Sequence, residues 1–220
     1  DQVIEDRFQR LVAYQSAGYA QRYLDQIEKV RSVDRDPEAG DSLTHTVAKQ
    51  LFKLMAYKDE YEVARLHSDD AFLTKLDAHF TGNYSIRFHL APPLLSKADP
   101  NTGKVKKYEF GPWLMPVFRT LAKLKWLRGT RWNVFALTSE RRQEREDLVR
   151  YQVDLAEVCD RLAPDNYCAA QQLMNLPEKL RGYGHVKSRN REALLAARSQ
   201  LLSEFYGDTQ YVEVTHQSAA

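Results

Sequence analysis

Apolar side chains recur with the 3.6-residue period of an α-helix along most of this sequence of 220 residues. The first such segment runs from Ile4 to Val30, and Pro37 and Gly40 interrupt the pattern after it. A helix of this kind is stable only when its apolar face is buried, so the pattern requires helices that pack on one another. We therefore expect a mainly α protein in which residues 1–215 form a single helical domain, followed by a disordered tail at 216–220.

Cap residues and helix breakers divide the remaining pattern into further segments. Asp41 or Ser42 is suited to begin the second helix, and Asn190 is suited to begin the last one. The other helices are expected at residues 60–66, 71–80, 112–127, 139–162 and 164–174.

One stretch departs from the helical period. Residues 84–90 alternate between apolar and polar side chains, which is the period of a β-strand, and Gly82-Asn83 and Pro92-Pro93 bound this run. A turn signal at residues 99–103 and a second extended run at 106–110 follow. The fold class predicted is therefore mainly α (α+β), a helical domain with an inserted β-hairpin at 84–110, to which residues 211–214 add a short C-terminal strand.

Composition and charge exclude several classes of protein. The 32 basic and 30 acidic residues nearly balance, which argues against a general nucleic-acid binder. No run approaches the ~18 apolar residues of a membrane span, and the first residues do not form a signal peptide. Cys159 and Cys168 belong to no CxxC motif, so we expect two buried, reduced thiols and a cytoplasmic protein. Because the chain begins with Asp1, we expect it to be a fragment or a processed or trimmed chain.

Five dense sequence words mix apolar and charged residues in an order that amphipathic helices do not require. They are YKDEYEVARLH (57–67), RFHLAPPLL (87–95), EFGPW (109–113), LKWLRGT (124–130) and RGYGHVKSRN (181–190). Together they resemble the C-terminal domain, a domain of unknown function, of the bacterial fused indolepyruvate:ferredoxin oxidoreductases. These belong to the 2-oxoacid:ferredoxin oxidoreductase family, and the resemblance runs from about Leu11 to about Phe205.

The resemblance implies that the parent enzyme oxidatively decarboxylates 2-oxo acids such as indolepyruvate to acyl-coenzyme A and passes the electrons to ferredoxin. Thiamine diphosphate, Mg and a [4Fe-4S] cluster would be held by its other domains. This chain alone would then have no catalytic residue, no metal ligand and no cofactor. It would pack on that core or organise it, and its partners would be the remaining domains, ferredoxin and coenzyme A. The parent enzyme is expected to be a homo-oligomer.

A first candidate site is a docking surface in residues 110–139, which contain five basic residues, all three tryptophans and no acidic residue. Arg119 and Lys123 are four residues apart, so they share one helix face, and Trp126 and Arg128 follow them. Such a surface suits an acidic protein partner or a phosphate-bearing ligand. The alternative is that these basic residues pair with carboxylates elsewhere in the chain.

A second candidate site is an anion-binding turn made of Arg181, Gly182, Gly184, His185 and Lys187. Glycines allow a ligand to approach the backbone closely, and the N-terminus of a helix favours an anion. On this hypothesis the chain is an independent helical binding module for an anionic ligand. The alternative is a structural turn whose basic residues pair with neighbouring carboxylates.

A third cluster, at residues 58–65, is interpreted as a half-buried network of ion pairs. Glu62 and Arg65 are three residues apart and Lys58 and Glu62 four apart, the spacings of side-chain pairs on one helix face.

Overall fold

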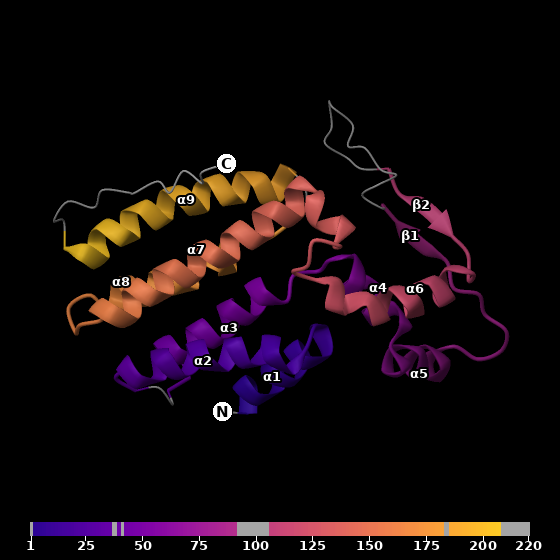
Figure 1. Ribbon diagram of the computed structural model, residues 1–220, viewed down its shortest axis with the longest axis horizontal. Coiled ribbons are helices and arrows are strands. Elements are labelled where there is room, and N and C mark those ends of the chain that lie inside the picture. The colour runs from indigo at the N-terminus through magenta and orange to yellow at the C-terminus, as the bar shows by residue number, and fades with distance from the viewer. Residues whose placement is uncertain (1, 37–38, 41, 92–105, 183–184, 208–220) are drawn as a thin grey trace. The chain divides into compact units, whose positions relative to one another are not determined.

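The computed structural model describes residues 2–36, 39–40, 42–91, 106–182 and 185–207, without the side chains of 185–188. Within these ranges the chain forms nine α-helices, three short 3-10 helices and one two-stranded antiparallel sheet (Figure 1). The prediction of a mainly α fold with an inserted hairpin is confirmed. The hairpin tip at 99–103, the strand at 211–214 and the tail at 216–220 lie outside the described residues.

The chain divides into two compact units. Unit 1 comprises residues 1–24 and 52–149, and unit 2 comprises residues 25–51 and 150–220. The divisions fall inside α2 (Ala17–Val33), α3 (Leu43–Met55) and α7 (Ser139–Arg161). The prediction of a single domain over residues 1–215 stays a prediction.

Unit 1 is built around the contact between α4 and α6. Besides parts of α2, α3 and α7, it contains α1 (Gln2–Tyr14), α4 (Glu60–Ser68), α5 (Asp70–His79), β1 (Phe88–Leu90), β2 (Tyr108–Phe110), α6 (Leu114–Lys123), η1 (Leu124–Leu127) and η2 (Val134–Leu137). Ala64 of α4, Phe88 of β1, and Leu114 and Phe118 of α6 form one buried cluster. The rings of Phe88 and Phe118 meet edge to face with centroids 5.0 Å apart, an arrangement that aromatic pairs prefer.

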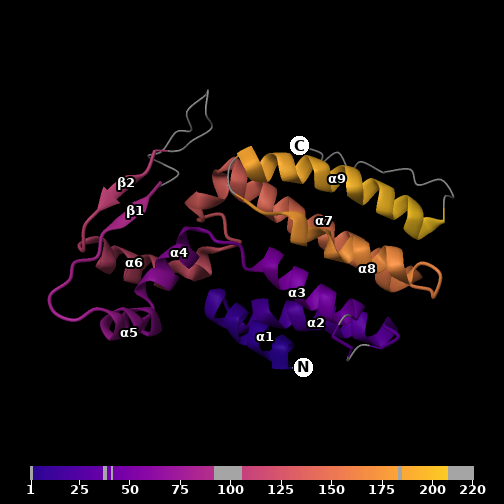
Figure 2. The same ribbon diagram turned by 180° about the vertical axis from the view of Figure 1, so that it is seen from behind.

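The two strands pair where the alternating pattern predicted them, but they are shorter. Phe88 lies opposite Phe110, His89 opposite Glu109 and Leu90 opposite Tyr108. The apolar face of β1 packs on α4 and α6, whereas His89 is exposed on the other face. Residues 84–87 belong to no strand, so the strand covers only three residues of the predicted run of seven. β1 and β2 lie side by side in both views (Figures 1 and 2).

Unit 2 contains α8 (Tyr167–Asn175), η3 (Leu176–Lys179) and α9 (His185–Tyr206), with parts of α2, α3 and α7. α8 and α9 lie side by side in both views (Figures 1 and 2). A buried ion pair joins α7 to α9, because Nε and Nη2 of Arg198 each donate to a carboxylate oxygen of Asp154 at 2.7 Å. The hydroxyl of Tyr151 donates to the carbonyl of Met174 at 3.1 Å and so ties α7 to α8.

Two predicted helix boundaries are wrong. The apolar pattern from residue 4 to 30 covers two helices, because α1 ends at Tyr14 and Ser16 begins α2 by accepting a hydrogen bond from the Tyr19 amide at 3.2 Å. The last helix begins at His185 and not after Asn190. The side-chain amide of Asn190 instead donates to the carbonyl of Arg181 at 2.8 Å, which fastens α9 to the preceding turn.

Candidate functional site

The face of α6 that points away from the core is basic and aromatic. Arg119 and Lys123 are both exposed on this helix, opposite the buried Leu114 and Phe118. The 3-10 turn η1 continues the helix directly, so that Trp126 follows Lys123 with a side chain that is 61% exposed. We call Arg119, Lys123 and Trp126 the basic stripe.

Exposed tryptophan is a general feature of this part of unit 1. Trp113 is 61% and Trp132 72% exposed, so all three tryptophans of the chain are largely in contact with solvent. A side chain of this size is usually well buried in a protein that has no binding partner. Exposed large apolar groups beside basic ones are typical of surfaces that bind a partner.

Arg128 does not belong to that surface, although its sequence position predicted it there. It is 5% exposed, and its Nε and Nη2 each donate to a carboxylate oxygen of Asp59 at 2.6 Å. Its Nη1 donates to the carbonyl of Tyr14, and its guanidinium lies 3.8 Å from the centre of the Tyr14 ring. The backbone explains the reversal, since the 3-10 helix ends at Leu127, Arg128 has the non-helical dihedrals φ −55° and ψ 133°, and Gly129 then turns the chain at φ +77°.

The charge of Arg128 is fully compensated inside the fold. Burial lowers the pKa of Arg128, but the hydrogen bonds to Asp59 and the surrounding negative charge outweigh it, so the pKa lies above its ordinary value. Burial, with the negative charge of Asp59, raises the pKa of Tyr14. Asp59 also accepts a hydrogen bond from the Glu62 amide at 2.8 Å, which caps α4. This arrangement is structural.

Lys125 is likewise used within unit 1. Its ammonium group donates to the carbonyls of Val12 at 3.3 Å and Ala13 at 2.6 Å, near the end of α1. A lysine at this place satisfies carbonyls that the helix itself leaves without a donor. Burial lowers the pKa of Lys125. Of the basic residues from 119 to 128, only Arg119 and Lys123 therefore remain for an external partner.

The predicted network at residues 58–65 exists in part. Arg65 and Glu62 form the expected pair at 2.7 Å, and Asp59 is paired with Arg128 as described. A carboxylate oxygen of Glu60 lies 3.5 Å from Nε of Arg141, and Nη1 of Arg141 pairs with Glu144. Burial raises the pKa of Glu60 despite the neighbouring Arg141. Lys58 is exposed.

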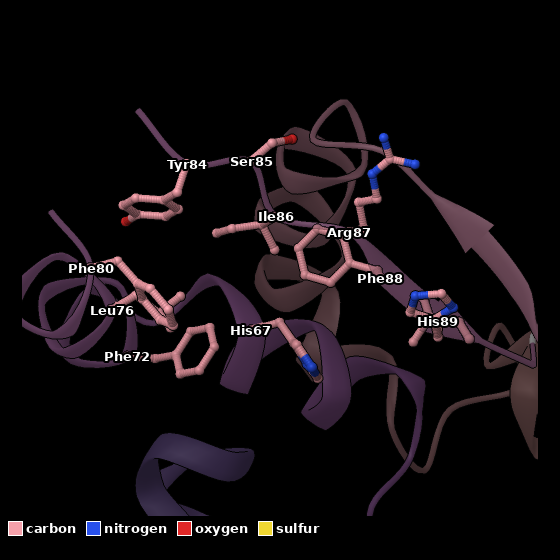
Figure 3. A pocket seen from close by; sticks show the side chains of 11 residues that line it. His67, Phe72, Leu76, Phe80, Tyr84, Ser85, Ile86, Arg87, Phe88 and His89 are labelled. Atoms are coloured by element: carbon pink, nitrogen blue, oxygen red, sulfur yellow. The ribbon is translucent and has the colours of Figure 1, made fainter. Parts of the chain in front are cut away.

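A pocket of about 350 Å³ lies between α5 and the segment of residues 84–87 that precedes β1 (Figure 3). Figure 3 shows Ile86 and Phe88 directed toward His67, Phe72 and the end of α5, whereas Arg87 points to the opposite side. The pocket is lined by His67, Phe72, Leu76, Phe80, Tyr84, Ser85, Ile86, Arg87, Phe88, His89 and Leu90.

The lining suits a small apolar group. The Nδ1 atom of His67 is 2.7 Å from the carbonyl oxygen of Val63, and its ring meets those of Phe72 and Phe88 edge to face. Sequence reasoning missed this pocket. The available signal was the spacing of Phe72 and Leu76, which puts two apolar residues on one face of α5, a helix with no buried residue, with Phe80 directly after its end.

The predicted anion-binding turn is described only in part. Arg181 is exposed, and its guanidinium pairs with Glu178 three residues earlier, an internal partner of the kind that the alternative interpretation expected. Gly182 has φ +93°, a conformation that favours glycine. Gly184 and the side chains of His185 and Lys187 lie outside the described residues.

The described residues contain no group of three His, Cys, Asp or Glu side chains arranged to hold a metal ion. None of their helices combines the length and the apolar content needed to cross a membrane. Cys168 is exposed and Cys159 half-buried, so the expectation of two buried thiols is wrong for Cys168, and burial raises the pKa of Cys159.

These features define a mainly helical protein that exposes a basic and aromatic surface on one of its two units. The chain belongs to a family of unknown function, DUF6537, whose model matches residues 1–200. Searches of curated proteins and of solved structures found no match.

Proposed function

We propose that the chain is a non-catalytic domain of an indolepyruvate-type ferredoxin oxidoreductase. It packs on, or organises, the core that decarboxylates 2-oxo acids to acyl-coenzyme A. In this proposal thiamine diphosphate, Mg and the [4Fe-4S] cluster are held by other domains of the parent polypeptide. A [4Fe-4S] cluster needs about four thiolates, and this chain has two cysteines.

The observation that carries the proposal is where the resembling words lie in the fold. Asp59, from the word at 57–67, is held by Arg128, from the word at 124–130. Phe88, from the word at 87–95, pairs across the sheet with Phe110, from the word at 109–113. Four of the five resembling words thus contribute residues to contacts within unit 1, whereas the fifth, at 181–190, belongs to unit 2. Contacts of this kind are what a domain with a packing function requires.

Several charged residues of these words also have structural partners. Asp59 and Glu62 pair with Arg128 and Arg65. Side chains engaged in this way are poorly placed for acid–base catalysis, which needs a group that can exchange protons with a substrate. This supports a role in packing rather than in chemistry.

The proposal is tested on the complete natural polypeptide. Its reading frame should contain, upstream of this segment, a GDG motif followed by an Asn about 25 to 30 residues later, the pattern of thiamine-diphosphate enzymes. The purified polypeptide should reduce ferredoxin with indolepyruvate and coenzyme A. A version that ends before this segment should keep its iron–sulfur absorbance but lose assembly or activity, and the isolated chain should bind to it in gel filtration. A reading frame without that motif, or a truncated enzyme that keeps full activity and assembly and does not bind the chain, would refute the proposal.

A further inference from the structure

We infer that the basic stripe of Arg119, Lys123 and Trp126 docks an acidic protein surface. The three residues follow one another at intervals of four and three, so they lie on one face of the continuous helical segment formed by α6 and η1. All three are exposed, and residues 110–139 around them contain no acidic residue.

The two cations of the stripe are available for a partner. In the described part of the chain, no carboxylate pairs with Arg119 or Lys123. The nearby Arg128 and Lys125 show the contrast, since a buried aspartate and two helix carbonyls engage them. The alternative stated from the sequence was that the basic residues of this span pair with carboxylates of the chain. Arg128 does so, whereas Arg119 and Lys123 do not within the described residues.

The indole of Trp126 adds an anchor beside the charges. Tryptophan and arginine are the side chains most enriched among residues that contribute strongly to protein–protein binding. An indole that is 61% exposed can contribute more to association than to the stability of this unit. Flanking cations would steer an acidic surface toward it.

Charge decides between an acidic protein and other occupants. A second copy of the chain that used the same face about a twofold axis would bring equal charges together. A nucleic acid usually requires a broad basic footprint, whereas this chain has 32 basic against 30 acidic residues. A local basic stripe with a tryptophan instead matches an acidic protein surface of ordinary interface size. Under the proposed function, on which the choice of partner rests, ferredoxin is such an acidic protein.

The test measures binding and not turnover, so that its failure can be told apart from a failure of the proposed function. Ferredoxin is titrated into the complete polypeptide by calorimetry at low and at moderate salt. The variant Arg119→Glu/Lys123→Glu should weaken binding by about tenfold or more and reduce its salt dependence. The control Arg22→Glu/Lys75→Glu reverses two exposed charges elsewhere in unit 1 and should change the dissociation constant by less than about twofold. Trp126→Ala should also weaken binding by about tenfold while leaving the salt dependence intact.

Each other result overturns the inference. Equal weakening by both double variants would mean that only net charge matters. No binding, or unchanged binding in the stripe variants, would exclude this face. A single-stranded oligonucleotide that displaces ferredoxin from the stripe would assign it to nucleic acid. If the stripe variants bind ferredoxin normally while the truncation experiment gives its expected result, the proposed function stands without this docking site. If the stripe variants lose binding while the truncation experiment fails, the docking site stands and the proposed function is refuted.

Discussion

Arg128 and Asp59, which are 69 residues apart in the sequence, form a bidentate ion pair in which each side chain is only 3% exposed. The pair joins the end of η1 to the N-terminal cap of α4. Removing one charge of such a pair leaves the other charge buried without compensation. The loss of folding stability is then larger than the net stabilisation that the intact pair contributes.

We therefore expect Arg128→Ala to lower the free energy of unfolding by about 3–5 kcal/mol. Arg119→Ala is the matched control, because Arg119 is exposed and should change stability by no more than about 0.5 kcal/mol. Urea denaturation followed by circular dichroism measures both. A small effect at Arg128 would contradict the structural role given to the pair.

The buried position of Glu60 makes stability depend on pH. Burial raises the pKa of Glu60 above its ordinary value of 4.5, because Arg141 compensates the carboxylate only in part. A carboxyl whose pKa is raised by folding contributes stability that is fully present below pH 4.5 and is lost as the pH rises through the raised value. Glu60→Gln should therefore be more stable than the parent chain at neutral pH, and this difference should vanish toward pH 4.

The control for this experiment is Glu146→Gln, which changes an exposed carboxylate on α7. Its unfolding free energy at neutral pH should differ from that of the parent chain by no more than about 0.5 kcal/mol. If Glu60→Gln instead destabilises the protein at neutral pH, the contact with Arg141 outweighs the cost of burial.

The periodicity of apolar residues in the sequence predicted most of the fold. The spacing of apolar residues predicted the helices, and the alternation at residues 84–90 predicted the hairpin and the faces of Phe88 and His89. The break at Ser16 was missed because the apolar period continues through it, so that only a local cap marks the start of α2. A period in the sequence reports which face is buried, not where the backbone is interrupted.

The candidate site was less predictable for a physical reason. The sequence places Arg119, Lys123 and Arg128 in one acid-free span, yet only the last turns inward. Its partner Asp59 is brought to it by the packing of α4, and no local rule connects them. Local rules describe helix faces well, but a charge beyond the end of a helix is placed by tertiary contacts.

Two glycines with equally open surroundings allow the cost of backbone strain to be isolated. Nothing lies within 4 Å of a Cβ added at Gly129 or at Gly18, but Gly129 has φ +77° and Gly18 lies in α2. Gly129→Ala should destabilise the chain by about 1–2 kcal/mol, since a side chain disfavours the left-handed region. Gly18→Ala should stabilise it by about 0.5–1 kcal/mol. Thermal unfolding of both variants gives the comparison, and effects of the same sign would contradict it.

In unit 2, the hydroxyl of Tyr167 connects the start of α8 to the link between α2 and α3. It donates to Asp34 at 2.8 Å and accepts from the Leu43 amide at 3.1 Å. Asp34 also accepts from the amide and the hydroxyl of Thr44, both at 2.7 Å, so one carboxylate holds the beginning of α3. Tyr167→Phe removes the hydroxyl but keeps the ring that Arg35 covers at 4.0 Å.

The loss of this hydroxyl should cost about 1–3 kcal/mol, because a hydrogen bond to a charged group contributes more than a neutral one. Tyr108→Phe in the sheet is the matched control, because Tyr108 is 37% exposed. This variant should change the free energy of unfolding by less than about 0.5 kcal/mol. The pKa of Asp34 lies below its ordinary value of 3.8. Burial raises this pKa, but the hydrogen bonds from Thr44 and Tyr167 lower it by more than burial raises it. The stability from Asp34 is therefore present above pH 3.8 and lost as the pH falls through the lowered value. Urea unfolding of Tyr167→Phe at pH 7 and at pH 3 should show a smaller defect at the lower pH, and an equal defect at both would mean that the hydroxyl acts through Leu43 alone.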